Sequence, residues 1–321
     1  MEIREFPRVN VEGGARLIIV GDVHGCSTEL DQLLDKVRFV QGRDVLLLLG
    51  DLVNKGVDSE GVVRRAMSIP NCYAILGNHD VKLLGTIRSL RSGAISEREQ
   101  NPFVQLALTF PDDCAEYLRN LPHVYRIPQF NLIAVHAGLN PALPLEDQKL
   151  WEVLHMRTID HEGVVAGKRV VTDKPDDSAQ PWAKLWRGPE TVIFGHDAEA
   201  KLQIEPFAIG LDTGCCDGEK LSAMVYPGKE LVQVNSGVPK RPTAAEKFHP
   251  CYRVYKACKR GAGCEFAGYP FKACIYHLRG DCKSGHGCTF LHIDFTGPKS
   301  HPNHSALPSL PPVAAAGSTS V

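Results

Sequence analysis

This sequence contains six side chains that could bind a metal ion, and each follows shortly after an apolar run. They are Asp22, His24, Asp51, Asn78, His136 and His196. The first two stand two residues apart in Gly21–Gly25, which follows Leu17–Val20. Carboxylate, amide and imidazole groups together suit divalent ions such as Mn²⁺, Fe²⁺, Zn²⁺ or Co²⁺. The pattern therefore indicates a metal-dependent hydrolase.

The apolar runs before these groups have the length of β-strands. They cover residues 17–20, 45–49, 73–76, 132–135 and 191–194. All-apolar runs suit strands buried on both faces of a sheet, as in an α/β fold. Ligands gather at the carboxyl ends of such strands because the loops converge there. We therefore expect an α/β domain with all six side chains at one edge.

A centre built from these groups is expected to hold two divalent ions. Such ions lie about 3.5–4 Å apart and share one carboxylate ligand, which we expect to be Asp51. The separate ligands are then Asp22 and His24 for one ion, and Asn78, His136 and His196 for the other. A water molecule bridging the two ions is deprotonated near neutral pH and is the expected nucleophile.

The same motifs resemble those of the calcineurin-like metallophosphoesterases, within the phosphoprotein phosphatase superfamily. The matching stretches are Gly21–Cys26, Gly50–Val53, Leu76–Asp80, His136–Gly138, Gly195–His196 and Leu211–Cys216. They are most similar to the symmetrical diadenosine tetraphosphatases, and the resemblance covers residues 15–235. It implies a central β-sandwich flanked by helices and the same metal ligands. It also implies that His79 donates a proton to the leaving group.

One position departs from the protein phosphatases of that superfamily, which carry Asp-Arg where this chain has Asn54-Lys55. Asn54 cannot charge His79 as a carboxylate does. A leaving group that is itself a phosphate needs less protonation, so the departure favours phosphoanhydride substrates over phosphoserine. Lys55, Arg157 and Arg187 are the candidates for binding substrate phosphates.

Other stretches carry expectations about local structure. Apolar spacing predicts a helix over residues 27–37 with Ser27-Thr28 as its cap, and residues 223–234 are expected to form a hairpin. Asp212 is expected to fix the following turn or to support a histidine. His155, like His123 and His161, is expected at the surface without a role.

Composition separates the chain into two unlike parts. Its 321 residues, 43% hydrophobic and 23% charged, fit one large globular domain and a smaller one. The net charge of -1 hides a basic segment, Lys240–Lys299, which has 11 Lys and Arg against 4 Asp and Glu. Six of the 11 cysteines lie in this segment. Local basicity indicates a polyanionic partner.

The clustered cysteines predict zinc rather than disulfides. Cys274, Cys282, Cys288 and His292 are separated by seven, five and three residues, the spacing of a Cys-Cys-Cys-His zinc finger. An earlier array, Cys251, Cys258 and Cys264, has Gly268 where the histidine would stand. That array is either degenerate or completed by His249 or His277, which remain alternatives.

The expected organisation is a phosphatase domain over 15–235, a linker over 236–247, a cysteine module over 248–293 with its complete finger at 274–292, and a disordered tail over 297–321. Fingers of this type bind single-stranded RNA, here with Tyr276 and Phe290 as stacking groups. A structural or protein-binding finger is the alternative.

These features predict a dinuclear phosphohydrolase of nucleotide-type phosphoanhydrides, such as diadenosine tetraphosphate and, with the finger, capped RNA. A protein serine/threonine phosphatase, an endopolyphosphatase and a non-enzymatic RNA-binding adaptor are the alternatives. Met1–Glu5 is charged, without the apolar core of a signal peptide. No run approaches the roughly 18 apolar residues of a membrane span. We therefore expect a cytoplasmic protein without a membrane partner, with the nucleus left open.

Overall fold

The chain forms two compact units, Met1–Lys240 and Arg241–Val321, which are described separately. The computed structural model describes residues 1–160, 171–172, 179–239, 266, 269, 273–280, 282–284 and 288–293. No helix in these ranges is long and apolar enough to cross a membrane.

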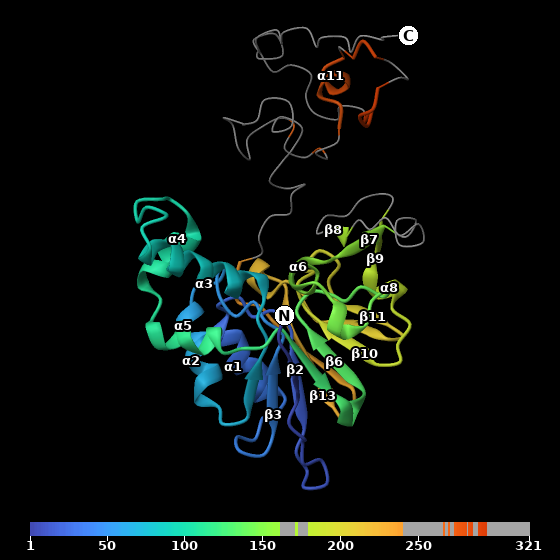
Figure 1. Cartoon of the computed structure of the whole chain (residues 1–321). Helices are drawn as coiled ribbons and strands as arrows, with labels where there is room; N and C mark the ends of the chain where they lie inside the picture. Colours follow the sequence, from blue (N-terminus) through green and yellow to red (C-terminus); the bar gives the residue numbers. More distant parts are fainter. Residues whose placement is uncertain are drawn as a thin grey trace. The chain divides into compact units, whose positions relative to one another are not determined.

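Two mixed sheets form the centre of the first unit (Figure 1). One has the strand order β1-β5-β6-β10-β12-β11 and the other β14-β13-β2-β3-β4. The strands of the six-stranded sheet are β1 (Ile3–Glu5), β5 (Val124–Ile127), β6 (Leu132–Val135), β10 (Thr191–Phe194), β11 (Gln203–Glu205) and β12 (Ala208–Gly210). Those of the five-stranded sheet are β2 (Leu17–Val20), β3 (Val45–Leu48), β4 (Cys72–Ala74), β13 (Lys220–Tyr226) and β14 (Glu230–Asn235). A small third sheet contains β7 (Thr158–Asp160), β8 (Val171–Thr172) and β9 (Ala179–Pro181).

The two large sheets stack face to face because their strands are apolar on both sides. In β2, Leu17 and Ile19 belong to the core shared with the other sheet. Ile18 and Val20 belong to the core beneath the helices. Successive strand residues point to opposite faces, so an uninterrupted apolar run serves two cores at once. The sandwich expected from the sequence is therefore present.

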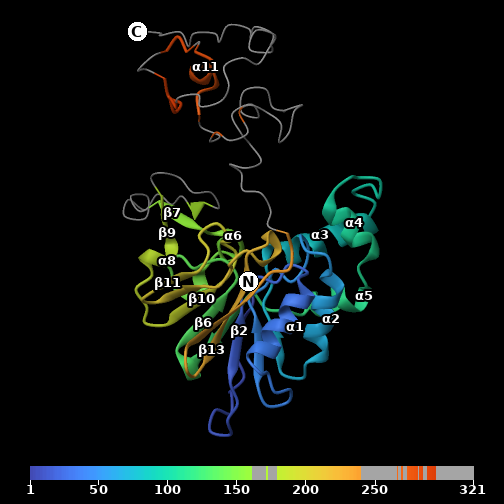
Figure 2. The same cartoon turned by 180° about the vertical axis from the view of Figure 1, so that it is seen from behind.

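Helices cover the outer face of each sheet (Figures 1 and 2). The five-stranded sheet packs against α1 (Ser27–Lys36), α2 (Ser59–Ser68), α3 (Asn78–Arg91), α4 (Pro102–Thr109) and α5 (Asp112–Arg119). The six-stranded sheet packs against α6 (Leu150–His155) and α8 (Trp182–Leu185). Short 3₁₀ turns lie at Pro128–Phe130, Leu145–Asp147 and Cys215–Asp217. The result is a mixed α/β fold in four layers, helix, sheet, sheet and helix.

Local predictions from the sequence have mixed outcomes. The helix expected over residues 27–37 is α1, and the expected hairpin is β13 with β14. The predicted cap is wrong, because the N-cap position is Cys26 and carries no side-chain hydrogen bond. Ser27 instead donates through Oγ to Oδ2 of Asp58 at 2.6 Å. That carboxylate also caps α2, so it draws the hydroxyl away from its own helix.

The first unit begins before residue 15, the expected boundary. β1 pairs in parallel with β5, with Ile3 opposite Val124. Three residues at the edge of a sheet, two of them charged, give no alternating pattern that would reveal the strand.

The described part of the second unit centres on α11 (Ile275–Leu278). An isolated bridge joins Ala273 to Leu291, and the Cys274 amide donates to the Leu291 carbonyl oxygen at 2.7 Å. The tail expected over 297–321 and most of the linker expected over 236–247 lie outside the described residues.

Candidate metal centre

The strand ends bring the six candidate ligands together at one edge of the sandwich. β2 runs parallel to β3, and β3 to β4, so the loops after them leave the sheet on the same side. In the other sheet, β6 runs parallel to β10. The loops from both sheets meet around the carboxylate of Asp51, as the contacts below show.

Asp51 lies between histidines that come from different sheets. Its Oδ2 is 3.3 Å from Nε2 of His24, and its Oδ1 is 3.5 Å from Nε2 of His136. The ligand atoms of Asp51, His136 and His196 lie within 4.8 Å of one another, as do those of His24, Asp51 and His79. Each oxygen of one carboxylate therefore faces a separate group of ligand atoms.

Backbone carbonyl groups orient the histidine rings. Nδ1 of His24 is 3.0 Å from the Val53 oxygen, and Nδ1 of His136 is 2.9 Å from the Leu49 oxygen. For His196 the contact is made by Nε2, 3.2 Å from the His155 oxygen. A carbonyl oxygen only accepts, so the ring nitrogen facing it carries the proton. The other nitrogen keeps its lone pair, as a metal ligand requires.

The arrangement of acceptors fits a cation. Nε2 of His136 lies 2.9 Å from Oδ1 of Asn78, so two lone pairs face each other when Nδ1 holds the proton. Within the described chain, Oδ2 of Asp22 is buried and has no hydrogen-bond partner. Buried acceptors without a donor are strongly unfavourable unless a positive ion satisfies them. The residues present therefore fit divalent ions.

Burial shifts the protonation of these groups in opposite directions. It raises the pKa of Asp51 to about 7 and raises that of Asp22, which also feels the charges of Asp212 and Asp51. It lowers the pKa of His136 to about 4, and those of His24 and His196 fall as well. A divalent cation binds neutral imidazoles and ionised carboxylates, and its charge would offset the repulsion between the closely spaced carboxylates.

Three of the candidate ligands have left-handed backbone conformations. The φ angles are 47° for His24, 49° for Asp51 and 68° for His196. Non-glycine residues adopt this region at a cost of about 1–3 kcal/mol each, and such strain concentrates at functional sites. The loops also approach closely, since a Cβ on Gly195 would lie 2.0 Å from Oδ1 of Asp22.

His79 occupies the position expected for an acid, but its partner is an amide. Its Nδ1 is 2.9 Å from Nδ2 of Asn54, and its Nε2 is 4.0 Å from Oδ2 of Asp51. Because the amide donates to Nδ1, Nε2 carries the proton of the neutral ring. Burial and the charge of Lys55 lower the pKa of His79 to about 3, so the ring is neutral near pH 7.

Asp80, which the sequence analysis did not single out, supports the centre by accepting hydrogen bonds from backbone amides. It is fully buried and accepts hydrogen bonds from the amides of Leu52 at 3.0 Å, Val53 at 3.3 Å and Gly77 at 2.9 Å. It thereby joins the loop after β3 to the start of α3. The motif Leu76–Asp80 contained the signal, an acid at the third helical position, where a capping box places one.

Two of the three candidate phosphate-binding residues lie at the centre. Nζ of Lys55 is 2.7 Å from Nε2 of His24. Arg157 donates to the His196 carbonyl oxygen at 3.1 Å, and its charge partly offsets the rise that burial causes in the pKa of Asp51. Arg187 differs, because it is exposed and donates at 2.6 Å to the Lys184 carbonyl oxygen of its own turn. Its contacts in the described chain are with that turn and with none of the candidate ligands.

Asp212 and His155 both make hydrogen bonds close to the candidate ligands. Asp212 fixes the turn that follows it, accepting from the Gly214 amide at 3.0 Å, which confirms that prediction. The expectation of no role for His155 is wrong, since its carbonyl oxygen holds the ring of His196. A backbone acceptor of this kind leaves no trace in the sequence. His161 lies outside the described residues.

The complete cysteine array also converges. The ligand atoms of Cys274, Cys282, Cys288 and His292 lie within 4.8 Å of one another. The His277 amide donates to Sγ of Cys274 at 3.4 Å, and the His277 ring stacks on His292 with 4.1 Å between centroids. These four groups could hold zinc. Cys251, Cys258, Cys264 and His249 lie outside the described residues.

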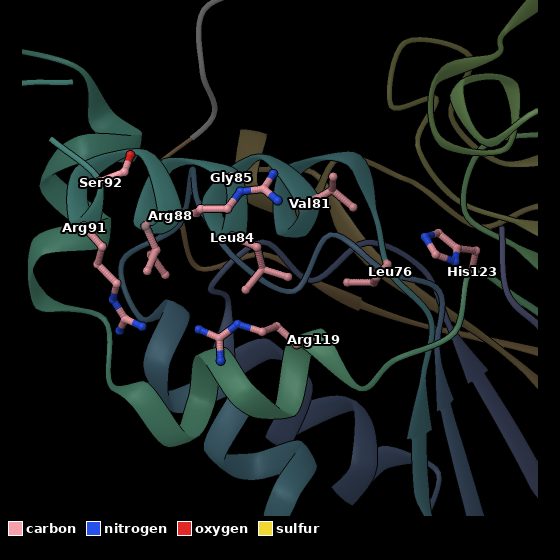
Figure 3. A pocket seen from close by; sticks show the side chains of 10 residues that line it. Leu76, Val81, Leu84, Gly85, Arg88, Arg91, Ser92, Arg119 and His123 are labelled. Carbon is pink, nitrogen blue, oxygen red and sulfur yellow. The ribbon is translucent and has the colours of Figure 1, made fainter. Parts of the chain in front are cut away.

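A groove of about 720 Å³ lies between α3 and α5 (Figure 3). Arg88 from α3 and Arg119 from α5 both line this groove. Its lining contains none of the six candidate ligands and no carboxylate. The groove therefore lacks the groups that metal-assisted hydrolysis requires.

Comparison with known proteins agrees with the geometry. Residues 15–200 match the family described as Calcineurin-like phosphoesterase. The chain is 29% identical over 262 residues to a symmetrical bis(5'-nucleosyl)-tetraphosphatase of Erwinia tasmaniensis, covering 66% of this chain and 94% of that protein. It is 27% identical over 255 residues to PrpE, an asymmetrical bis(5'-nucleosyl)-tetraphosphatase of Oceanobacillus iheyensis, covering 73% and 96%. A solved structure described as "Crystal structure of a putative diadenosine tetraphosphatase" shares 42% identity at a TM-score of 0.66, covering 74% of this chain and 99% of its own.

Fold, site and relatives together define a metal-dependent hydrolase of phosphate esters or anhydrides. The family match spans more than half of the residues, so the chain belongs to the calcineurin-like phosphoesterases.

Proposed function

We propose that this protein hydrolyses phosphoanhydride bonds in nucleotide-type substrates, with dinucleoside tetraphosphates as the first candidates. The carboxylate of Asp51 carries the proposal, because its two oxygens face His24 and His136 at 3.3 and 3.5 Å. That geometry supports Asp51 as the ligand shared by two ions. Asp22 and His24 then complete one ion's site, and Asn78, His136 and His196 the other's.

The proposed ions supply Lewis-acid polarisation of phosphate oxygens and activation of water when they are bound. The chain's own residues position the substrate. Lys55 and Arg157 lie beside the ligands and are proposed to bind phosphate oxygens, since fixed positive charges stabilise the negative charge that phosphoryl transfer spreads over them. Arg187, which contacts its own turn, is not included.

Nucleotides are favoured over phosphoproteins by the state of His79. The neutral ring beside Asn54 holds a proton on Nε2 but is a far weaker acid than imidazolium. A phosphate leaving group needs little protonation, whereas a serine alkoxide needs much. The relatives' names point the same way, since both curated relatives described above are bis(5'-nucleosyl)-tetraphosphatases.

A substrate panel tests the proposal. The full chain with Mn²⁺ or Co²⁺ is compared on diadenosine tetraphosphate, capped RNA, inorganic polyphosphate and a phosphoserine peptide. We expect the dinucleotide to be cleaved, and Asp51→Asn to reduce kcat by at least about a hundredfold, as removal of one electrostatic group at the reacting centre does. Turnover of the peptide alone would replace the proposal with a protein phosphatase, and turnover of polyphosphate alone with an endopolyphosphatase.

For the second unit we propose a structural zinc ion on Cys274, Cys282, Cys288 and His292 and, with it, binding of single-stranded RNA. The convergence of the four ligand atoms supports the zinc. Tyr276 and Phe290 are 38% and 41% exposed, so bases could reach part of each side chain. Capped RNA as a substrate would follow if both activities act on one molecule.

A further inference from the structure

Trp151 is placed unlike the other tryptophans of the chain. It is 46% exposed, whereas Trp182 is 1% exposed and Trp186 packs against the core beneath α8. A large exposed aromatic ring is unfavourable in water, and such rings mark binding surfaces more often than the single aliphatic residues scattered over a protein. Trp151 lies in α6, which follows the loop after His136 and its strand β6.

The exposed indole is connected to the candidate metal centre through one residue. Its ring stacks on His155, with 5.3 Å between centroids and an interplanar angle of 12°. The His155 ring in turn meets the His196 ring edge-on at 6.3 Å. Two ring-to-ring steps therefore separate the indole from a candidate metal ligand.

Hydrogen bonds hold this arrangement in place. Nδ1 of His155 is 3.0 Å from the Trp151 carbonyl oxygen, which fixes the imidazole beneath the indole. The His155 carbonyl oxygen is 3.2 Å from Nε2 of His196. His155 therefore links the indole to the candidate metal ligand through two hydrogen bonds, one made by its ring and one by its carbonyl oxygen.

A positively charged side chain also contacts His196, the candidate ligand next to His155. Arg157 follows His155 by two residues and donates to the His196 carbonyl oxygen at 3.1 Å. An aromatic face beside a phosphate-binding cation is the combination that proteins use for nucleotides, since the base stacks while the phosphates bind the charge.

We infer that Trp151, backed by His155, is a stacking site for a purine base of the substrate. The inference rests on the proposed function, because it assigns one nucleoside of a nucleotide substrate to a surface beside the metal centre. Stacking discriminates between substrates with and without a base, and it tolerates both adenine and the guanine of a capped RNA. Trp151 thereby determines which phosphoanhydrides the centre accepts.

Kinetics on substrates with and without bases test the inference. Trp151→Ala should raise KM for diadenosine tetraphosphate about tenfold, within the roughly 5- to 150-fold range for loss of one stacked base. Its kcat should change little, and KM for inorganic tetrapolyphosphate and inorganic pyrophosphate, which have no aromatic ring, should stay within about twofold. Trp151→Phe should restore most of the affinity, and Trp151→Leu should not, since leucine keeps apolar area but has no π face.

Leu150→Ala is the matched control, because Leu150 is 39% exposed on the same helix and has no aromatic ring. It should leave all three KM values unchanged. An equal rise of KM on base-free substrates in Trp151→Ala, or the same selective rise in Leu150→Ala, would overturn the inference and assign Trp151 to support of α6.

A binding measurement separates this inference from the substrate proposal. Adenosine monophosphate should quench part of the intrinsic tryptophan fluorescence, inorganic phosphate should not, and Trp151→Phe should remove the quenching. If the wild-type protein leaves diadenosine tetraphosphate intact while this quenching persists, the proposed function fails and the stacking site stands. If the dinucleotide is cleaved but neither quenching nor KM depends on Trp151, the stacking site fails alone.

Discussion

Asn54 donates from Nδ2 to Nδ1 of His79 at 2.9 Å, at the position where a carboxylate would accept a hydrogen bond instead. The amide orients the ring but adds no negative charge to it. With its pKa lowered to about 3, His79 stays neutral over the physiological range. We propose that this difference of one atom, an amide nitrogen in place of a carboxylate oxygen, favours phosphate leaving groups over alkoxide ones.

Asn54→Asp should shift the substrate preference. A carboxylate accepting from Nδ1 favours the charged ring and raises the pKa of His79, which makes Nε2 a stronger acid. General-acid catalysis contributes about 10²–10⁴-fold, so kcat/KM for a phosphoserine peptide should rise roughly tenfold relative to that for diadenosine tetraphosphate. Parallel assays of both substrates measure the ratio. Asn54→Ala is the control, and a ratio that is unchanged in Asn54→Asp would contradict the role given to the amide.

Sequence alone identified the residues whose chemistry is visible in their type. The six candidate ligands, Lys55 and Arg157 lie together as predicted from motif and position. Asp80 and His155 were missed, because one acts through three backbone amides and the other through its own carbonyl oxygen. Arg187 lies apart from this group, because a basic residue in a loop can equally donate to the carbonyl groups of its own turn, as Arg187 does to Lys184.

At the scale of elements, the loops of the two sheets fit together too tightly to admit extra atoms. A Cβ on Gly195, at the end of β10, would lie 2.0 Å from Oδ1 of Asp22, which follows β2. The contact between the sheets therefore depends on the absence of a side chain at one position.

Gly195→Ala should displace the carboxylate of Asp22 and weaken metal binding. Residues that orient a metal ligand without touching the metal typically contribute 10- to 100-fold to metal affinity, and we expect the affinity for Mn²⁺ to fall by a factor in that range. Titration with Mn²⁺, followed by activity and by calorimetry, measures it. Gly228→Ala is the control, since a Cβ there meets no atom within 4 Å. Unchanged affinity in Gly195→Ala would show that the loops can separate without harm.

Asp44 joins the loop after α1 to the start of β2, and it predicts a pH effect. Burial alone would raise its pKa, but hydrogen bonds from Arg16 and from the Val40 amide lower it to about 2. Since the folded pKa lies below the ordinary value of 3.8, the stabilisation is complete above about pH 4. It is lost as the pH falls towards 2.

Asp44→Asn should therefore reduce the free energy of unfolding by roughly 1–2 kcal/mol at pH 7, with a smaller difference near pH 3. Urea unfolding at both pH values checks this. Asp31→Asn removes only an exposed ion pair with Arg65 and should change stability much less. A difference between wild type and Asp44→Asn that does not shrink in acid would contradict the account.

The elements themselves were predictable where the periodicity was strong. α1 and the hairpin of β13 and β14 were expected, and so was the burial of β2 and β3 on both faces. β1 was not, because three residues at a sheet edge show no pattern, and neither was the Cys26 cap. The spacing of residues within α1 does not reveal that the Ser27 hydroxyl donates to Asp58, the N-cap residue of α2.

At the scale of the whole molecule, we expect zinc and RNA binding by the second unit to be independent of hydrolysis by the first. Cys282→Ser should remove one zinc ion and weaken RNA binding while leaving hydrolysis of diadenosine tetraphosphate unchanged. If Cys274, Cys282, Cys288 and His292 hold zinc as proposed, a segment this small would depend on the ion for its folding. Zinc content, RNA affinity at two salt concentrations and kcat measure the three effects. RNA affinity equal to that of the wild type would contradict the proposed role of the finger.

β2, the strand that precedes Asp22 and His24, lies between β3 and β13 in its sheet. Residues 220–226 of β13 are therefore required before the strand made at residues 17–20 has both of its neighbours. On the ribosome, all six candidate ligands have been synthesised by residue 196, yet the strand that precedes the first of them still has an open edge. Until the final hairpin of the first unit emerges from the exit tunnel, the backbone N–H and C=O groups along one edge of this apolar strand lack their β13 partners.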